Sequence, residues 1–322
     1  MLRACALLLT IAAAVIPGAA QAAWPDRPIK LIVPFSAGSS SDTIARIVAA
    51  KMSDALRQPI VIENRVGGST IIGTDAVAKS APDGYTLGLA NTTTHAVSAS
   101  VNSKLPFDPL KDFVPIGMIG QSPFVLVASP VLPTQTLARF VTLAKEKPGK
   151  LTYASAGTGT LAHLAGELFK RKADIDVVHV SYRGTEQSAL DLMQGRIDLS
   201  VSTIPPTLQQ IRGGTLRALG VMAEHRSAMM PDVPTVGEGG VPGCEAELWT
   251  ALVAPAGVPA DIVQRLNEAL NSAVNDAAVQ DALKLQGVEL RPGPPEAVTA
   301  AIKSDTLKWR GIAQSTKLGE VK

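Results

Sequence analysis

Apolar and polar positions along the chain alternate between short apolar runs and longer stretches with helical spacing. Residues 29–33 form the first apolar run, which is typical of a buried parallel strand. Pro34 ends the run because proline has no N–H for a strand ladder, and six small residues follow at 36–41. From Asp42 to Leu56 the apolar positions take the spacing of one helix face. The small-residue loop therefore lies over free N–H groups at a helix start, where an anion can bind.

This strand–loop–helix pattern recurs along the rest of the chain. Strands that alternate with helices are typical of parallel sheets covered by helices on both faces. The strands are too numerous for one sheet of ordinary width, so we predict an α/β fold with two lobes, each a mostly parallel sheet flanked by helices. We predict strands at 29–33, 60–62, 85–89, 116–119, 124–128, 151–154, 177–180, 197–201, 216–222, 248–253 and 288–290, and helices at 42–56, 71–79, 137–145, 161–169, 185–195, 206–212, 262–273 and 295–313.

Small polar loops follow several of the predicted strands. Ligands of such sheets bind beside the carboxyl ends of the strands, which is where these loops lie. Their recurrence in both predicted lobes indicates a cleft walled by backbone N–H groups and hydroxyls. The loops span 36–41, 64–70, 91–95, 155–160 and 181–184.

The composition is that of a globular chain. It has 322 residues, of which 46% are apolar, 18% charged and 4% aromatic, with a formal net charge of +2. This length accommodates two domains of ordinary size. The sequence has no basic run and no interleaving of basic with aromatic residues, so we expect no nucleic-acid partner.

The first 22 residues have the features of a secretory signal peptide. Arg3 gives a positive start, 7–16 is an apolar core, and a small-x-small cleavage site ends at Ala22. We expect a periplasmic mature protein with 29 basic and 28 acidic residues, a net charge of +1. Later apolar runs fall short of the roughly 18 to 20 residues that a membrane helix needs. Cys5 leaves with the leader, so Cys244 has no partner for an intrachain disulfide and should be buried.

Cofactor and catalytic interpretations find little support in the motifs. Residues 157–162 fit the dinucleotide pattern G-x-G-x-x-A, but the next strand ends at Ser181 without the acidic residue that such a site needs. A hydrolase would need an activated serine, and there is no G-x-S-x-G motif; Asp42 is better explained as a helix cap. We therefore expect no catalysis, no metal and no cofactor. Arg183 either clamps a carboxylate or pairs with Glu186, and the sequence leaves both interpretations open.

Five stretches of the sequence carry a family resemblance. They are WPDRPIKLIVPFSAGSSSD at 24–42, VIENRVGGSTIIGTDAVAKSAPDGYTLGLANTTTHAV at 61–97, LTYASAGTGTLAHLAGELFK at 151–170, VSYRGTEQSALDLMQGRIDL at 180–199 and GTLRALGV at 214–221. Together they resemble the periplasmic substrate-binding proteins of tripartite tricarboxylate transporters, the Bug family. The spacing agrees from Trp24 to about Arg310.

The resemblance implies a two-lobed Venus flytrap fold, with lobe one at 23–122 plus 249–322 and lobe two at 123–248. It also implies that the protein captures a small carboxylate between the lobes and delivers it to a membrane permease. We expect the protein to be a monomer. In the family, the loops matching 36–41 and 155–160 hold the carboxylates through backbone N–H groups and ordered waters. The family often has Pro-Gly-Gly in the first loop, where this chain has Ala37-Gly38-Ser39, so the water pattern and the ligand can differ.

Two facing loops suit a ligand with more than one carboxyl group, so we predict a di- or tricarboxylate. An extracytoplasmic sensing partner is an alternative function, and a secreted hydrolase is a less favoured one. The lobes should close by a hinge near 120–123 and 246–249. The candidate ligand-binding residues are Phe35, Ser36, Ala37, Gly38, Ser39, Asp42, Thr92, Thr93, His95, Ser155, Gly157, Thr158, Gly159, Thr160, His163, Tyr182, Arg183, Gly184 and Thr203.

Overall fold

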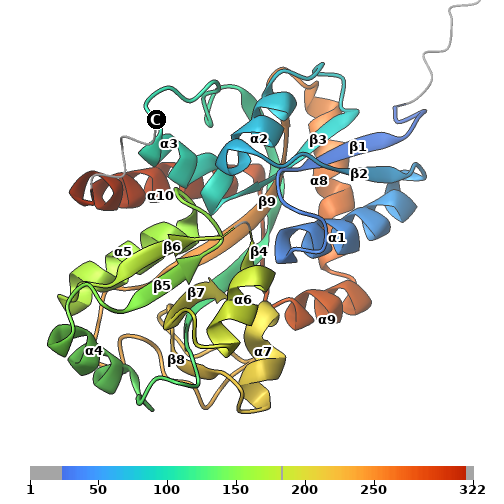
Figure 1. The fold of residues 1–322 in the computed structure, drawn as a ribbon. Helices are drawn as coiled ribbons and strands as arrows, with labels where there is room; N and C mark the ends of the chain where they lie inside the picture. The colour runs from blue at the N-terminus through green and yellow to red at the C-terminus, as the bar shows by residue number, and fades with distance from the viewer. Residues whose placement is uncertain (1–23, 183, 317–322) are drawn as a thin grey trace, which may run out of the picture.

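The computed structural model describes residues 24–182 and 184–316, which form two α/β lobes joined by long strands (Figure 1). The α/β fold predicted from the alternating pattern is confirmed. The predicted leader and its cleavage site lie outside the described residues. No helix among the described residues is long and apolar enough to cross a membrane.

The first lobe is built on a mixed sheet. Its three outer strands are parallel, β9 is antiparallel to them, and β4, which is antiparallel to β9, runs in their direction. The sheet runs in the order β2 (Ile60–Asn64), β1 (Ile29–Val33), β3 (Thr86–Asn91), β9 (Glu247–Pro255) and β4 (Phe113–Ala128), and β10 (Glu289–Gly293) pairs with β4.

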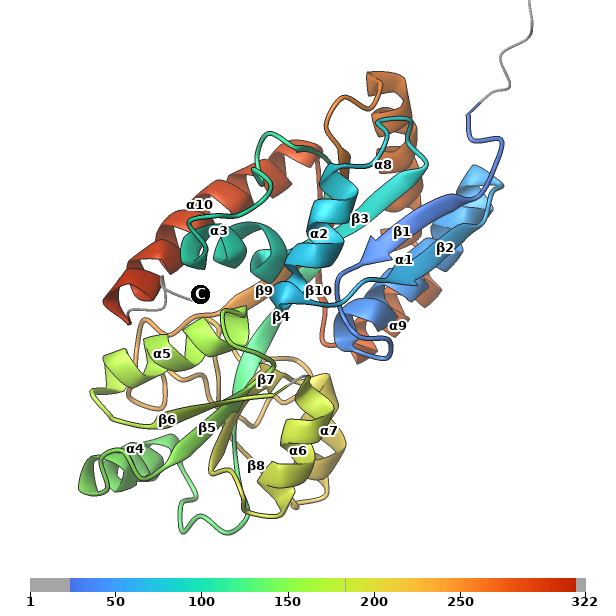
Figure 2. The ribbon, with the colours of Figure 1, turned by 45° about the horizontal axis from the view of Figure 1, so that its top comes forward.

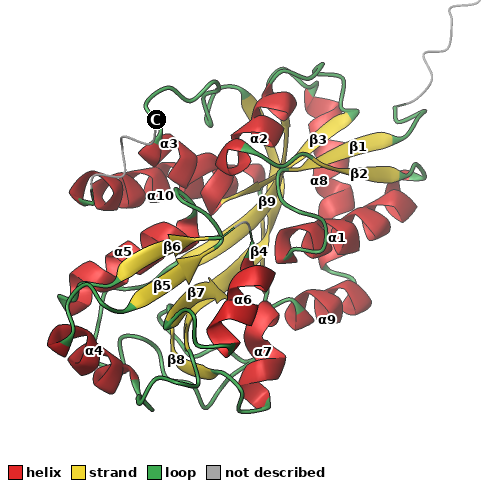
Figure 3. Cartoon of the chain, viewed as in Figure 1, coloured by secondary structure: helices red, strands yellow, loops and turns green. Residues whose placement is uncertain are grey.

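Helices cover both faces of this first sheet (Figure 3). The helices α1, α8 and α9 share one apolar core with it, while α2 and α10 share another core on the opposite face. The helical segments are α1 (Ser40–Leu56), the 3₁₀ turn η1 (Gly68–Thr70), α2 (Ile71–Ala78), the π-helical turn η2 (Thr92–Val97), α3 (Ser98–Val101), α8 (Ala260–Val274), α9 (Ala277–Leu285) and α10 (Pro295–Ser315).

The second lobe repeats the design on a smaller scale. Its parallel strands are β5 (Thr152–Ser155), β6 (Val178–Ser181) and β7 (Leu199–Thr203), and β4 and β8 (Arg217–Val221) are antiparallel to one another. Helices α4 and α5 share one core of the lobe, and α6 and α7 share the other. These helices are α4 (Leu137–Glu146), α5 (Leu161–Ala173), α6 (Thr185–Met193) and α7 (Pro205–Arg212).

The expectation of mostly parallel sheets holds for the outer three strands of each lobe and not for the strands between the lobes. The chain leaves the first lobe along β4 and returns along β9, so these two strands must run in opposite directions. They pair with each other across the junction, with Gln121 opposite Trp249 and Pro123 opposite Glu247. The predicted hinge segments are therefore neighbours in one two-stranded ribbon.

The two strands predicted at 116–119 and 124–128 form the single strand β4. Pro123 lies where the partner on one side of β4 changes from β10, last paired at Gln121, to β7, first paired at Phe124. A missing N–H costs little at such a change of partner, which is why proline does not end the strand here.

The last helix reaches from the first lobe to the second, beside α5 (Figure 2). Trp309 and Ala313 near its end belong to the same apolar core as α4 and α5. Trp249 donates from Nε1 to Asp305 at 2.8 Å, which ties the helix to the crossing strand β9. Cys244 is a free, buried cysteine, as predicted, and burial raises the pKa of its thiol to about 12.

Candidate functional site

A cleft of about 690 Å³ lies between the lobes, at the carboxyl ends of their parallel strands. Both lobes contribute small, hydroxyl-bearing and glycine residues to its walls, as the recurrent small loops predict. Ten of the candidate ligand-binding residues line it: Phe35, Ser36, Ser39, Thr93, Gly157, Thr158, Thr160, Tyr182, Gly184 and Thr203.

Eight further candidates are not among the described residues that line the cleft, and most of them support the loops from behind. Thr92 and His95 belong to the turn η2, and the others lie in or behind the two main loops. Arg183 lies outside the described residues. The eight are Ala37, Gly38, Asp42, Thr92, His95, Ser155, Gly159 and His163.

Several lining residues were not among the candidates. The loop at 64–70 had the same signature as the others, a small-residue run after a strand, and could have been included on that ground. Phe124, Val201 and Leu248, which form the floor of the cleft, carried no such signal, because an apolar residue in a strand is ordinarily a core residue. The additional lining residues are Pro34, Ser40, Ser41, Val66, Gly67, Gly68, Ser69, Thr70, Phe124, Ala156, Ala162, Ser181, Thr185, Val201, Ser202 and Leu248.

We call residues 36–41 the first loop, and Asp42 organises it from below. The side chain of Asp42 is 2% exposed. Its Oδ2 accepts from the Gly38 amide and from Arg46 Nε, both at 2.9 Å, and its Oδ1 accepts from Asn64 Nδ2 at 2.8 Å. Burial alone would raise the pKa of Asp42, but the hydrogen bonds from Arg46, Gly38 and Asn64 outweigh burial and hold the pKa below its usual value. Asp42 is therefore an ionised support of the loop.

The first loop leaves amides free at the start of α1. The Ser39 amide donates to Ser36 O at 3.2 Å, and the Asp42 amide to Ser39 Oγ at 3.4 Å. No hydrogen bond recorded for the described residues engages the amides of Ser40 or Ser41, and both residues line the cleft. Because α1 has 17 residues, its N-terminus places about half a positive charge beside these amides.

We call residues 155–160 the second loop, and its amides are occupied by the lobe itself. The Gly157 amide donates to Ser155 Oγ at 3.3 Å, and the Thr158 amide to Ser181 Oγ at 3.0 Å. The Gly159 amide donates to His163 Nδ1 at 3.1 Å, and the Thr160 amide donates to Gly157 O at 3.3 Å. The several free N–H groups expected at this helix start therefore do not include these four amides in this structure, because three side chains and the Gly157 carbonyl accept from them.

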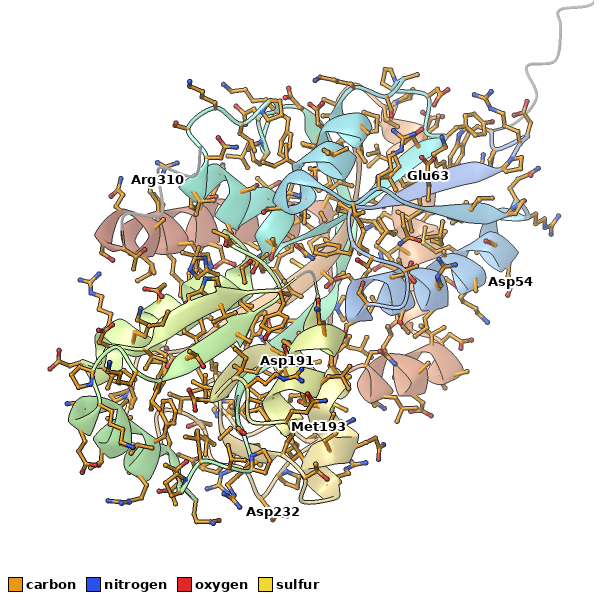
Figure 4. All side chains as sticks on the ribbon, viewed as in Figure 1. Asp54, Glu63, Asp191, Met193, Asp232 and Arg310 are labelled. Carbon is orange, nitrogen blue, oxygen red and sulfur yellow. The ribbon has the colours of Figure 1, made fainter. Side chains whose placement is uncertain are left out.

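Hydroxyls and one amide remain available on the lobe-two wall. Ser181 Oγ accepts from Thr158, and no acceptor for its own proton is recorded among the described residues; the hydroxyls of Thr158 and Thr203 likewise have no recorded partner there. The Ala162 amide, in the first turn of α5, also has no recorded partner. The Tyr182 hydroxyl is not available to a ligand as a donor, because it donates to Asp191 Oδ2 at 2.8 Å. Asp191 lies on α6 and is labelled in Figure 4.

The loop at 64–70 also brings the lobes into contact beside the cleft. Ser69 and Thr70, just before α2, both have left-handed backbone, with φ of 50° and 83°. Such strain in residues other than glycine is concentrated at functional sites. Ser69 Oγ donates to Thr158 O in the opposite lobe at 3.0 Å, and the Leu161 amide donates across the cleft to Thr93 Oγ1 at 3.3 Å. The lobes are therefore hydrogen-bonded to each other in this structure.

Two of the candidate residues in the turn η2, Thr92 and His95, support the fold and do not face the cleft. Thr92 Oγ1 donates to Glu247 O at 3.2 Å and accepts from the Trp249 amide at 3.1 Å, so it braces the crossing strand. His95 is 1% exposed, and its ring packs edge-on against Phe113 with centroids 4.6 Å apart. Burial lowers the pKa of His95 to about 3, which keeps the ring neutral.

A serine–histidine contact does exist in the second lobe. Ser155 Oγ lies 2.7 Å from His179 Nε2, but Ser155 is 1% exposed and its hydroxyl is turned toward Gly157. Substrate in the cleft therefore has no approach to this oxygen. The described residues hold no group of three or more histidine, cysteine, aspartate or glutamate side chains that could bind a metal.

Comparison with known proteins gives one consistent family. Residues 44–318 match the family described as the tripartite tricarboxylate transporter family receptor. Protein BugT of Bordetella pertussis is 37% identical over 294 residues, which cover 91% of this chain and 90% of BugT.

Two solved structures from Rhodopseudomonas palustris are also similar. MatC with bound malate superposes with a TM-score of 0.84 at 32% identity and covers 90% of this chain and 99% of its own. Rpa4515 with adipate superposes with a TM-score of 0.86 at 32% identity and covers 90% of this chain and 97% of its own.

Proposed function

The chain belongs to the tripartite tricarboxylate transporter receptor family, a family of periplasmic solute-binding proteins, and we propose that it captures a small carboxylate between its lobes. The proposal includes delivery of that ligand to the membrane permease of such a transporter. The resemblance noted in the sequence is thereby confirmed at the level of the family. The ligand, the partner and the binding residues are what we propose.

The observation that carries this proposal is the pair of open amides at Ser40 and Ser41. They lie in the cleft wall at the positive end of a 17-residue helix and have no recorded partner among the described residues. A carboxylate accepts from two adjacent N–H groups at once and is attracted by the helix dipole. The first loop is thus suited to one carboxyl group of the ligand.

A second carboxyl group fits the opposite wall. The hydroxyls of Thr158, Ser181 and Thr203 and the Ala162 amide are neutral donors on that side of the cleft. Between the two walls, Phe124, Val201 and Leu248 give the floor an apolar surface that suits a carbon chain. Malate and adipate, which occupy the two similar structures, each carry two carboxyl groups.

A melting screen with mono-, di- and tricarboxylates, sugars and amines tests the ligand class. Ligand at about 100 times its dissociation constant stabilises the folded state by roughly 2.7 kcal/mol. Each kcal/mol raises the melting temperature by about 2–4 °C for a folding unit of this size, so we expect a shift of about 5–11 °C. We expect dicarboxylates to give the shift, and Arg183→Ala to reduce it only in part. A shift with a sugar or an amine and with no carboxylate contradicts the proposal.

We propose the predicted lobe bounds, 23–122 plus 249–322 and 123–248, and closure about the ribbon of β4 and β9. Support comes from the hydrogen bonds of Ser69 and Leu161 across the cleft, which can form only when the lobes are close. Hinge closure around a ligand is a common response of two-lobed proteins. Small-angle scattering should show a smaller radius of gyration with saturating malate or adipate. Equal radii count against closure.

We also propose export with removal of residues 1–22, a monomeric mature protein and no chemical change to the ligand. Intact mass of the exported protein should correspond to a chain that begins at Ala23. Size-exclusion chromatography with light scattering should give the mass of one chain. Mass spectrometry of a bound acid after long incubation should show it unaltered.

A further inference from the structure

A stacked pair of imidazoles lies behind the second loop. His163 from α5 and His179 from β6 have ring centroids 3.7 Å apart and an interplanar angle of 13°. The ring of Tyr153 packs beside them, with its centroid 4.9 Å from that of His179. Neither histidine is among the described residues that line the cleft. The pair can therefore affect a ligand only through the loop that it supports.

Each ring is connected to the loop by a hydrogen bond. His163 Nδ1 accepts from the Gly159 amide at 3.1 Å. Because an amide can only donate, Nδ1 of His163 carries no proton in this arrangement. His179 Nε2 lies 2.7 Å from Ser155 Oγ, which in turn accepts from the Gly157 amide at 3.3 Å. The two imidazoles thus fix two glycines of the second loop, of which Gly157 lines the cleft.

The charged and titratable groups around the pair are Glu167 and Lys170 of α5 together with Tyr153 of β5. Glu167 is occupied by the Tyr153 hydroxyl at 2.7 Å and by Lys170 Nζ at 3.0 Å. Burial, with smaller contributions from His179 and Lys170, lowers the pKa of His163 to about 3. Burial likewise lowers the pKa of His179 to about 4, with Glu167 opposing this and Lys170 adding to it. Both rings are neutral near pH 7.

We propose that His163, backed by the stacked ring of His179, is a positioning residue that holds the second loop in its ligand-binding shape, and that proton uptake by His163 releases the loop and weakens carboxylate binding in acid. This inference rests on the proposed function of the cleft. A protonated imidazole has N–H at both nitrogens, so Nδ1 of His163 then faces the Gly159 amide donor to donor. The protonated ring of His163 would also be stacked on the ring of His179.

The direction of the pH effect follows from linkage. The ordered loop requires a neutral His163, whereas a released loop lets the ring titrate near the ordinary value of 6.5. The released form therefore binds protons more readily. Its population rises as the pH falls from 6.5 toward about 3, the pKa of His163 in the ordered loop. Ligand affinity should be constant above this range and should fall within it.

The test compares the wild type with His163→Asn and His163→Leu. The Oδ1 of asparagine accepts from Gly159 where Nδ1 did and cannot take up a proton, whereas leucine offers no acceptor. His225→Asn is the matched control, because His225 is an exposed histidine away from the cleft. Isothermal titration with adipate and with malate at pH 7.5 and pH 5.0 gives the affinity of each protein.

We expect His163→Asn to bind as the wild type does at pH 7.5, and His163→Leu to bind weakly at both pH values. Between pH 7.5 and pH 5.0 the wild type should lose about tenfold more affinity than His163→Asn. Titration of the ligand and of Asp42 is common to both proteins and cancels in that ratio. The inference is overturned if wild type and His163→Asn lose the same affinity, or if His163→Leu binds as the wild type does.

A measurement without ligand keeps the inference separate from the proposed function. The Gly157 and Gly159 amide resonances should shift or broaden in the wild type as its His163 ring protonates, and should not do so in His163→Asn. Amides that stay unchanged while the wild-type ring protonates overturn the inference even if a variant does not fold. If neither adipate nor malate binds at pH 7.5, the proposed ligand class fails, and these amides still decide the role of His163.

Discussion

The first and second loops share one sequence pattern and differ in what they offer a ligand. Each is a run of small residues between a strand and a helix, residues 36–41 before α1 and 155–160 before α5. In the first loop, a buried carboxylate below the turn takes the Gly38 amide and leaves Ser40 and Ser41 open. In the second loop, four successive amides are engaged by groups of the same lobe.

The difference shows that a small-residue loop before a helix is a candidate anion site and no more than that. Whether its amides reach a ligand depends on which acceptors lie next to it. In this protein the first loop is suited to bind charge, and the second is suited to present a pre-shaped wall of hydroxyls. The supports also differ, because one loop rests on an ionised aspartate and the other on a neutral imidazole.

The largest expected effect is loss of the support of the first loop. Asp42→Ala removes a buried carboxylate that accepts three hydrogen bonds, including one from the Gly38 amide, and should lower the free energy of unfolding by about 3 kcal/mol. It should also abolish the melting shift with adipate or malate. Urea denaturation measures the first effect. Asp54→Ala, at an exposed position of the same helix (Figure 4), is the control and should change neither.

The next largest effect should come from backbone strain, which is expected to be greater in the second loop than in the first. Gly157 has φ of +145°, and a Cβ there would meet Thr160 Cγ2 at 3.3 Å, whereas Gly38 has φ of +82° and open space. Gly157→Ala should therefore lower the free energy of unfolding by about 2 kcal/mol and Gly38→Ala by about 1 kcal/mol. Denaturation of the two variants side by side measures this, and equal losses would mean that the loops are equally constrained.

Acid should loosen the loops at different pH. The pKa of His163 is lowered from 6.5, so the second loop should lose stability as the pH falls below 6.5. The pKa of Asp42 is lowered from 3.8, so its contribution should be complete above that value and should be lost only at lower pH. As the pH is lowered, the Gly159 amide should therefore lose its protection from hydrogen exchange at a higher pH than the Gly38 amide. The reverse order would contradict the assignment of supports.

The contact between the loops should have a smaller effect. Ser69→Ala removes the hydrogen bond to Thr158 O across the cleft, which is worth about 1 kcal/mol, or about fivefold in affinity. The loss should appear in the dissociation rate of the ligand measured by stopped flow, since the contact holds the lobes closed. Ser80→Ala, beyond the far end of α2, should leave that rate unchanged.

The smallest effect is expected at Ser39, where the family resemblance leads us to expect a glycine. Ser39 caps α1 through a long contact of 3.4 Å to the Asp42 amide. Ser39→Gly should change the free energy of unfolding by only a few tenths of a kcal/mol. Calorimetric titration with adipate and malate then reports whether the Ser39 hydroxyl contributes to ligand choice. A change greater than about 1 kcal/mol in stability would show that the cap is stronger than its length implies.

Local pattern alone was sufficient for most of the elements. The apolar run at β1 and the helical spacing through α1 predicted their bounds to within a few residues, because burial on one face repeats with the period of the element. The same reasoning predicted the α/β class and the small loops at strand ends. The quoted stretches were also sufficient for the family.

Long-range packing decided the rest. The strand β4 is continuous because its partners change at Pro123, which no local pattern records. The floor residues Phe124 and Leu248 face a cleft only because two distant strands meet there. Which amides remain open was decided in the same way, since Ser181 is brought to the Thr158 amide by another strand. The sequence by itself determined where anion sites could form, and tertiary structure selected among them because an amide bonds to whichever acceptor the fold places beside it.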